Sequence, residues 1–190
     1  MQQAGSPSPS LRRAVFLDRD GVLNEDRDDY VKSAEEMRLI PGAGRALARL
    51  RDAGYLCVLI TNQSPVGRGI FTHEWLAGIH ECLIERLLAE GGDLDDIEYC
   101  PHRPDEQCDC RKPRPGMLLR AIAKHGVAPA RSFMVGDKES DVAAGKAAGV
   151  RTIRVLIPDE DDATHSEADW KVRSLREAAD VILSLEEGPA

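Results

Sequence analysis

The sequence predicts an α/β fold, a doubly wound and mainly parallel sheet in one compact domain. Short apolar segments typical of buried strands alternate along the chain with segments whose apolar residues recur at helical spacing. Three of the apolar segments run into acidic or polar residues at Asp18, Thr61 and Asp137, and ligands bind at the carboxyl ends of strands in such folds. The 190 residues suit one domain, and their 42% hydrophobic content is enough to form a core.

The first half of the chain predicts two strands, each followed by a helix. The strands are expected over residues 14–18 and 55–60. One helix is expected over 43–53, directly after Pro41-Gly42. The next should begin behind Thr72, whose hydroxyl suits an N-cap. Apolar residues follow it at helical spacing, namely Trp75, Ile79, Leu83 and Leu87.

The second half continues the alternation. Its strands are expected over residues 96–100, 132–135, 151–156 and 168–172. Its helices are expected from Pro115 to about Lys124, over 139–148 and over 175–187, and an acidic loop is expected over 158–162. Strand and helix alternation of this kind implies right-handed crossovers and a parallel sheet.

Charge and composition exclude several classes of protein. The net charge of −8 argues against broad binding to nucleic acid or anionic membranes. No apolar run approaches the roughly 20 residues that span a membrane. Residues 1–13, MQQAGSPSPSLRR, lack the apolar centre of a signal peptide. We therefore expect a disordered leader, or an artificial extension, before a single domain over 14–190.

Five cysteines are present, and three of them fall within residues 100–110. An odd, clustered set is not typical of a secreted disulfide framework, so we expect a cytoplasmic protein. Cys57 lies in an expected strand and Cys82 in an expected helix, and both suit packing.

The segment VFLDRDGVLN at residues 15–24 is the strongest chemical signal. An apolar strand runs into Asp18 and Asp20, which are separated by one residue. Two carboxylates this close repel each other, and a divalent cation such as Mg²⁺ relieves the repulsion. The alternative for this segment alone is a strand that runs into an acidic turn.

Three further segments follow in order: LITNQS at 59–64, CRKP at 110–113 and MVGDKESD at 134–141. Together the four resemble the motifs of the haloacid dehalogenase-like (HAD) phosphatases, over residues 14 to 155. The resemblance implies that Asp18 is a nucleophile that forms an aspartyl phosphate and that Asp20 is the general acid and base. It implies further that Thr61 and Lys112 bind the phosphoryl group, and that Mg²⁺ is held by Asp18, by the main-chain carbonyl of Asp20 and by Asp137.

Asp141 lies one helical turn beyond Asp137. It could reach the metal through water or orient Lys138. The alternative is an ordinary acidic residue in the first turn of a helix, where the helix dipole favours it.

Residues 100–110, called the Cys/His loop below, carry Cys100, His102, Cys108 and Cys110. Four nitrogen and sulfur ligands at this spacing favour a structural Zn²⁺ site. Such a site would fix the residues that follow it, Arg111 and Lys112. The alternatives are reduced cysteines beside a surface histidine, or a disulfide. The remaining histidines, His73, His80, His125 and His165, are expected on the surface.

The gaps between the motifs leave no room for a large cap domain. With the Cys/His loop, the pieces FLDRDGVLN, TNQS followed by Arg68-Gly69, CPH, CDCRKP-x-PGM and MVGDK-x-x-D resemble the heptose 1,7-bisphosphate 7-phosphatase family. That family removes the C7 phosphate of a sugar bisphosphate. The resemblance implies a substrate site made by Asp26, Arg27, Asp28, Asp29, Tyr30, Thr61, Asn62, Gln63, Ser64, Arg111, Lys112 and Lys138.

Two departures keep alternatives open. Pro65 stands where the heptose enzymes carry glycine, so that loop is expected to be stiffer. The spacing of the Cys/His pairs is short and resembles that of the related histidinol-phosphate phosphatases, which share the CDCRKP string. A catalytically inactive HAD-like binding module is a third hypothesis. A monomer is expected, since the sequence leaves no evident apolar face unaccounted for.

Overall fold

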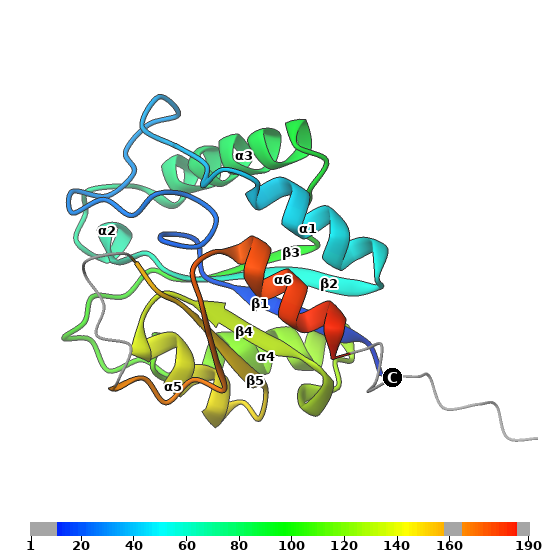
Figure 1. Cartoon of the computed structure of the whole chain (residues 1–190). Helices are drawn as coiled ribbons and strands as arrows, with labels where there is room; N and C mark the ends of the chain where they lie inside the picture. Colours follow the sequence, from blue (N-terminus) through cyan, green and yellow to red (C-terminus); the bar gives the residue numbers. More distant parts are fainter. Residues whose placement is uncertain (1–10, 158–164, 186–190) are drawn as a thin grey trace, which may run out of the picture.

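The computed structural model of the protein describes residues 11–157 and 165–185. Its centre is a six-stranded sheet in the order β3-β2-β1-β4-β5-β6, and every neighbouring pair is parallel (Figure 1). The strands are β1 (Arg13–Leu17), β2 (Tyr55–Asn62), β3 (Asp96–Cys100), β4 (Phe133–Gly136), β5 (Arg151–Val155) and β6 (Trp170–Val172). The chain winds outward from β1 to β3 and then from β4 to β6. The order therefore reverses between β1 and β4, the kind of position where doubly wound folds bind ligands.

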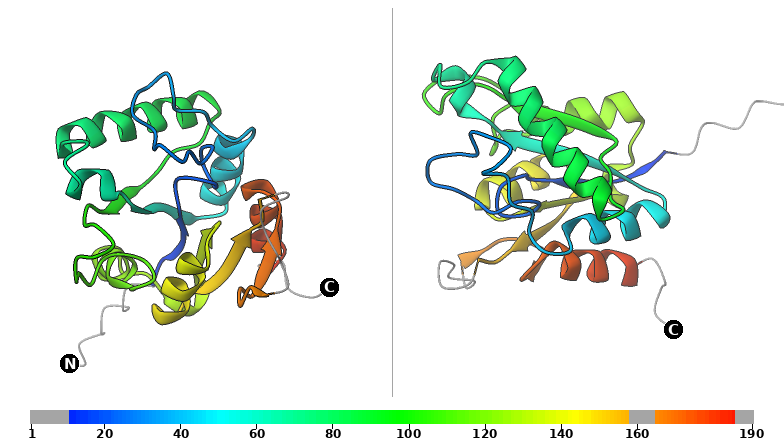
Figure 2. Two further views of the ribbon diagram at one scale, coloured as in Figure 1. Left: turned by 90° about the vertical axis from the view of Figure 1, so that its left-hand side faces the viewer. Right: turned by 90° about the horizontal axis from the view of Figure 1, so that it is seen from above.

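Helices cover both faces of this sheet. Helices α1, α3 and α6 lie on one face, and α4 and α5 lie on the other (Figure 1). On the first face α1 lies between α3 and α6 and contacts both (Figure 2). The helices are α1 (Ala43–Asp52), α2 (Ser64–Gly67), α3 (His73–Ala89), α4 (Gly116–His125), α5 (Glu139–Ala147) and α6 (Leu175–Ser184), with a 3₁₀ turn at Pro129–Arg131.

The core has two layers because successive strand residues point to opposite faces. In β1, Val15 and Leu17 join the cluster under α1, α3 and α6, whereas Ala14 and Phe16 join the cluster on the side of α4 and α5. All four are fully buried. A central strand buried on both faces reads as a continuous apolar run, which is why this strand was recognisable in the sequence.

The predicted fold class is confirmed, with shifts at the ends of elements. The first strand begins at Arg13, and Arg12 pairs with Val127, so both belong to the folded domain rather than to the expected leader. Thr72 is the N-cap of α3, and its hydroxyl accepts the Trp75 N–H at 3.1 Å. The last strand is shorter than expected. Residues 1–10, the expected acidic loop at 158–162 and residues 186–187 lie outside the described part of the chain.

Two features differ from the sequence prediction. The one-turn helix α2 follows β2, and Pro65 occupies its first turn. His80, expected on the surface, is buried and packs edge-on against Tyr99 of β3. It follows Ile79 on α3, at the margin of the apolar stripe, so helical spacing alone does not distinguish a buried from an exposed position there.

The segment between β1 and α1 contains only turns, bends and isolated bridges, and the described residues form no separate cap domain. The carboxyl ends of the strands are therefore covered by short segments. Over the same described ranges, no helix is both long and apolar enough to cross a membrane.

Candidate active site

A pocket of about 480 Å³ lies at the carboxyl ends of β1 and β2. Its walls come from the loops after these strands, from the Cys/His loop and the residues that follow it, and from the start of α5. The lining residues are Asp18, Asp20, Asp26, Arg27, Asp28, Tyr30, Thr61, Asn62, Gln63, Ser64, Arg68, Pro104, Arg111, Lys112, Lys138 and Ser140.

Almost every residue expected in the substrate site lines this pocket. Asp29 does not, because its side chain is turned outward and forms ion pairs with Arg27 and Lys32. Asp137, expected to hold metal, is buried behind the pocket wall at 2% exposure.

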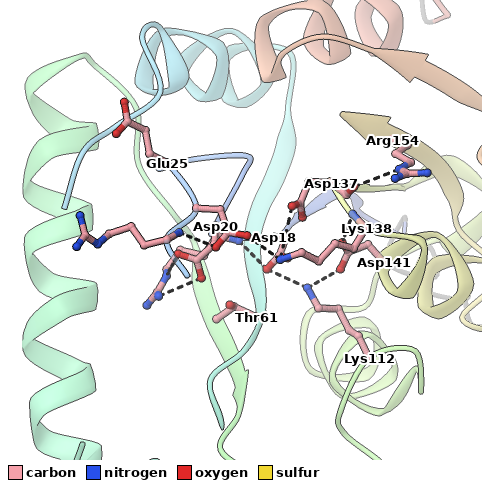
Figure 3. A network of polar contacts seen from close by, with 12 residues as sticks. Asp18, Asp20, Glu25, Thr61, Lys112, Asp137, Lys138, Asp141 and Arg154 are labelled. Atoms are coloured by element: carbon pink, nitrogen blue, oxygen red, sulfur yellow. Dashed lines mark hydrogen bonds and ion pairs between the residues drawn. The ribbon is translucent and has the colours of Figure 1, made fainter. Parts of the chain in front are cut away.

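Lys112 connects two buried carboxylates. Its Nζ lies 2.9 Å from Asp18 Oδ1 and 2.6 Å from Asp141 Oδ1, and it donates to the Ile60 carbonyl at 2.7 Å (Figure 3). The position of its backbone is fixed by Asn62, whose side chain accepts the Lys112 N–H and donates to the Lys112 carbonyl, both at 3.1 Å. Lys112 therefore lies beside Asp18, the residue predicted to be the nucleophile.

Burial sets the protonation of this cluster. Burial raises the pKa of Asp18 to about 6, although Lys112 partly offsets the effect. Burial alone would lower the pKa of Lys112, but Asp141 and Asp18 outweigh it and raise that pKa above its usual value. Lys112 is consequently held in its charged form, and it faces the carboxyl group of Asp18.

The carboxylates Asp18, Asp137 and Asp141 converge on one point. One oxygen from each lies within 4.8 Å of the others. Both Asp137 oxygens are buried without a hydrogen-bond partner in the described part of the chain, and Lys138 Nζ approaches no closer than 3.7 Å. Burying carboxylate oxygens without hydrogen-bond donors is unfavourable in free energy. Burial together with the Asp18 charge accordingly raises the pKa of Asp137 to about 7. An oxygen-ligated Mg²⁺ fits this donor set and would lower both raised pKa values.

Two glycines allow this convergence. A Cβ on Gly21 would lie 2.6 Å from Asp137 Oδ2, and a Cβ on Gly136 would lie 2.2 Å from Asp141 Cβ. Asp141 cannot retreat, because it is fixed by Lys112 and by the Lys138 N–H, which its Oδ2 accepts at 3.0 Å. The observed role of Asp141 is thus to pair with Lys112 and to cap α5.

Asp20 lies apart from this cluster, among donors. Arg19 donates to its two oxygens at 3.2 and 3.0 Å, Asn24 Nδ2 donates at 2.9 Å, and Gln63 Nε2 donates at 3.2 Å. Gln63 Nε2 also lies 2.9 Å from Thr61 Oγ1, which links the ends of the β1 and β2 loops. Burial alone would raise the pKa of Asp20, but the Arg19 charge and these hydrogen bonds hold it below its usual value.

The expected substrate loop is attached at both ends. Lys138 Nζ pairs with Asp26 Oδ2 at 2.8 Å, which ties the loop to α5. Trp75 Nε1 of α3 donates to the Lys32 carbonyl at 2.9 Å, and Arg86 Nη2 donates to the Ala34 carbonyl at 2.7 Å. In contrast, the carboxylate of Glu25 points away from the Asp18 cluster in Figure 3.

The Cys/His loop brings its four expected ligands together. Cys100 Sγ lies 3.5 Å from His102 Nδ1, 3.7 Å from Cys108 Sγ and 3.2 Å from Cys110 Sγ. A tetrahedral zinc ion with sulfur bonds of about 2.3 Å separates its ligand atoms by about 3.8 Å, so the set fits zinc. The cysteines are free thiols, which removes the disulfide alternative.

Two arginines of the pocket wall, Arg68 and Arg111, lie beside this loop. Arg111 Nη1 donates to the His102 carbonyl at 3.3 Å. Gly67 N–H donates to the Pro101 carbonyl at 2.8 Å, which holds the end of α2 and the following Arg68 against the same loop. Gly67 is needed there, because a Cβ would meet the Pro101 oxygen at 2.6 Å.

Sequence reasoning did not assign three residues of this site. Arg68 was named only as part of the motif that follows TNQS, and it was not included in the expected substrate site. Arg19 and Asn24 hold Asp20, but a charged residue beside two aspartates gives no sign in the sequence that it is buried. The signal for Arg19 is chemical, since a carboxylate buried next to it needs a cation.

Comparison with known proteins agrees with this geometry. The HAD hydrolase-like family model matches residues 109–178. A D-glycero-beta-D-manno-heptose-1,7-bisphosphate 7-phosphatase of Pasteurella multocida is 45% identical over 147 residues, 74% of this chain and 79% of that protein. The enzyme of the same name from Helicobacter pylori J99 is 41% identical over 175 residues, 91% of this chain and 98% of that protein.

A solved structure is similar over nearly the whole fold. The D,D-heptose 1,7-bisphosphate phosphatase from B. bronchiseptica, complexed with magnesium and phosphate, is 36% identical and has a TM-score of 0.84. The match covers 91% of this chain and 99% of that one.

Proposed function

The chain belongs to the D-glycero-beta-D-manno-heptose-1,7-bisphosphate 7-phosphatase family of HAD-like hydrolases, and we propose that it removes the C7 phosphate of D-glycero-D-manno-heptose 1,7-bisphosphate. The product is heptose 1-phosphate, a precursor of nucleotide-activated heptose. We propose the β anomer at C1, because the relatives from P. multocida and H. pylori are named for it.

The observation that carries this proposal is the pairing of cations in the pocket. Lys112 is paired with Asp18 and Asp141, Lys138 with Asp26, and Arg27 with Asp29.

The other two basic residues of the pocket wall, Arg68 and Arg111, form no ion pair within the described ranges. Both lie at the Cys/His loop, whereas the reacting phosphate belongs at Asp18. Two guanidinium groups free of carboxylates, at a place other than the reaction centre, suit a second phosphate on the same substrate.

The chain's residues supply a two-step reaction. Asp18 attacks phosphorus and the P–O bond to C7 breaks, so the phosphoryl group passes to Asp18 and the electron pair goes to the departing oxygen. Asp20 protonates that oxygen with a proton that it has first taken up from solvent. Asp20 then takes a proton from a water molecule as the water attacks phosphorus, the bond from phosphorus to Asp18 breaks, and inorganic phosphate leaves. Lys112 and Thr61 hold the phosphoryl oxygens throughout.

Two metal ions complete the proposal. Mg²⁺ would be held by Asp18, Asp137 and the main-chain carbonyl of Asp20, and it supplies positive charge that offsets the charge of the phosphoryl oxygens. Asp141 keeps its contact with Lys112 and acts on the metal only indirectly. Zn²⁺ at Cys100, His102, Cys108 and Cys110 would hold the loop that places Arg68 and Arg111.

Phosphate release by the purified protein with Mg²⁺ tests this function. The substrates are the α and β anomers of heptose 1,7-bisphosphate, heptose 7-phosphate and histidinol phosphate. We expect kcat/KM to be highest for the β-bisphosphate and lower for heptose 7-phosphate, which lacks the group that Arg68 and Arg111 bind.

Other outcomes would reject parts of the proposal. Preference for histidinol phosphate would overturn the substrate, although the relatives named above are heptose enzymes and do not favour it. Equal rates for the bisphosphate and heptose 7-phosphate would reject the role of the two arginines. Phosphate release from none of the four would support an inactive binding module.

We further propose a cytoplasmic monomer. The five cysteines are thiols, and three of them approach one another without bonding, which suits a reducing compartment. The pocket is lined by residues of one chain, so a second copy is not needed to complete it. Light scattering of the zinc-loaded protein would test the oligomeric state.

A further inference from the structure

Arg19 is a charged residue in the interior. It is 1% exposed and is the largest fully buried side chain of the described residues. Arginine is almost never fully buried unless it is paired, because removing its charge from water costs several kcal/mol. The position of its partners should therefore show what the burial achieves.

Arg19 is bound to both aspartates that flank it. Its backbone N–H donates to Asp18 Oδ1 at 2.7 Å. Its guanidinium donates to Asp20 through two nitrogens, Nε to Oδ1 at 3.2 Å and Nη2 to Oδ2 at 3.0 Å. Its carbonyl accepts the Leu23 N–H at 2.9 Å, which closes the turn after β1. One residue thus fixes the loop and contacts both carboxylates.

The guanidinium makes the one two-point contact that Asp20 has. Asn24 reaches only Oδ1 and Gln63 reaches only Oδ2, each through a single amide nitrogen. A planar, charged fork that meets both oxygens fixes the rotation of a carboxylate more firmly than the neutral hydrogen bonds of Asn24 and Gln63, each of which reaches one oxygen.

Nothing else in the described part of the chain competes for this charge. Asp20 is the carboxylate with which Arg19 forms an ion pair, and Nη1 has no hydrogen-bond partner. His80 of α3 is buried close by, and burial together with the Arg19 charge lowers the pKa of His80 to about 3. His80 is therefore neutral and adds no second charge near Arg19.

We propose that Arg19 is a positioning residue, which holds the Asp20 carboxyl group in the orientation from which Asp20, after taking up a proton from solvent, passes that proton to the departing oxygen. The inference rests on the proposed phosphatase mechanism and adds a residue to it. Arg19 touches neither the phosphate nor the metal in this mechanism, so its effect passes through Asp20.

The leaving group of the substrate tests this proposal. The departing alkoxide of a sugar phosphate needs a proton in the transition state, whereas p-nitrophenolate, a much weaker base, does not. The variant is Arg19→Met, which keeps the apolar stem and removes the fork. The readout is kcat/KM, because it reports the step that forms the aspartyl phosphate and not the later attack of water.

We expect Arg19→Met to lower kcat/KM for heptose 1,7-bisphosphate by roughly 10²-fold, within the range of general acid catalysis. For p-nitrophenyl phosphate we expect a change of less than about threefold, since no protonation is needed. Arg19→Lys retains the charge without the fork and should lie between wild type and Arg19→Met. Arg51→Met removes an arginine that pairs with Asp93 far from the pocket and should change neither substrate.

A double variant tests the proposal even if Arg19→Met lowers the stability of the protein. In an Asp20→Asn background, Arg19→Met should cause no further loss on heptose 1,7-bisphosphate, because its effect passes through Asp20. Additive losses, equal losses on both substrates, or no loss on the bisphosphate would each overturn the proposal. If Arg19→Met does not fold, kcat/KM for the two substrates is compared in the Arg19→Lys variant instead.

Assays of the wild-type protein distinguish a failure of this inference from a failure of the proposed function. Hydrolysis of p-nitrophenyl phosphate without hydrolysis of heptose 1,7-bisphosphate would reject the substrate alone, and another sugar phosphate would then serve as the alkyl ester. Hydrolysis of no phosphate ester would reject the function and the inference together.

Discussion

Two clusters in this protein are built in opposite ways. The carboxylate cluster takes Asp18 from the end of β1, Asp137 from the end of β4 and Asp141 from α5, and Lys112 joins it from a loop. The Cys/His cluster takes all four members from residues 100–110, which contain turns and bends rather than helix or strand after β3. The first is assembled by the sheet and the second by a single loop.

This difference indicates which of the two clusters needs a metal ion in order to form. Strand ends that are packed on both faces hold the carboxylates in place before any ligand binds. Burying these groups disfavours their charged forms, which is why the pKa values of Asp18 and Asp137 are raised. A polar loop has no such support, so the binding of zinc supplies part of the free energy of folding it. Changes in the two clusters should therefore have different consequences.

The largest effect is expected from Asp18→Asn. An amide cannot attack phosphorus, so turnover of heptose 1,7-bisphosphate should fall by roughly 10⁴-fold or more. Because the sheet assembles this cluster, the circular dichroism spectrum and cooperative thermal unfolding should be preserved. Asp29→Asn is the matched control, since Asp29 is exposed and lies outside the pocket, and it should retain activity. Appreciable turnover by Asp18→Asn would refute the nucleophile assignment.

Removing one ligand from the Cys/His loop should have an intermediate effect. In Cys108→Ser, zinc content measured by mass spectrometry should fall below one equivalent, and kcat/KM for the bisphosphate should fall about 10- to 100-fold. The melting temperature should fall too, unlike that of Asp18→Asn. Cys82→Ser is the control, because Cys82 lies outside the cluster. Full activity after loss of zinc would show that the loop holds its shape without the ion.

A smaller and more selective effect is expected from Arg68→Gln. Losing one charged hydrogen bond to a phosphate should raise the KM for heptose 1,7-bisphosphate about tenfold and leave kcat within about threefold. Heptose 7-phosphate should be unaffected, since it lacks the second phosphate. Arg103→Gln is the control, because Arg103 lies on the neighbouring Cys/His loop but is paired with Asp105 outside the pocket. Equal losses on both substrates would indicate a structural role.

The smallest effect concerns pH. An aspartate in the unfolded chain has a pKa near 3.8, and burial raises that of Asp137 to about 7 in the folded chain. Unfolding between these pH values releases a proton, so the stability of the Mg²⁺-free protein should fall as pH rises from about 4 to about 7. Mg²⁺ binds the ionised form and offsets this loss.

Differential scanning fluorimetry with zinc retained would measure the effect. Added Mg²⁺ should raise the melting temperature more at pH 7.5 than at pH 5, by about 2–4 °C for each kcal/mol of binding free energy gained. In Asp137→Asn this pH dependence should be reduced. An equal shift at both pH values would show that Mg²⁺ binds elsewhere.

The same contrast decides what could be predicted from the sequence. The Cys/His ligands were found from spacing alone, because all four lie within one short segment. The carboxylates were found because strands β1 and β4 are continuous apolar runs that end in aspartates, so their carboxyl ends could be located. The outer residues of the substrate site, Asp26 to Tyr30, were placed by resemblance, and Asp29 shows that one position of such a segment can face away.

What could not be predicted depends on tertiary contact. The burial of His80 results from its contact with Tyr99, which is contributed by a different strand. The contact of Lys112 with Asp141, and the pairing of Arg19 with Asp20 rather than with solvent, follow from side-chain directions that periodicity does not encode. The helix α2 is a single turn, too short to produce a periodic pattern.

The Cys/His loop also bears on how such an enzyme could change. It begins at the end of β3, carries all four of its ligands and reaches the rest of the site mainly through backbone carbonyls, at Pro101 for α2 and at His102 for Arg111. The loop can therefore be lengthened or replaced while the carboxylate cluster stays intact. Evolution can thus alter which phosphate ester is accepted independently of how its phosphorus–oxygen bond is broken.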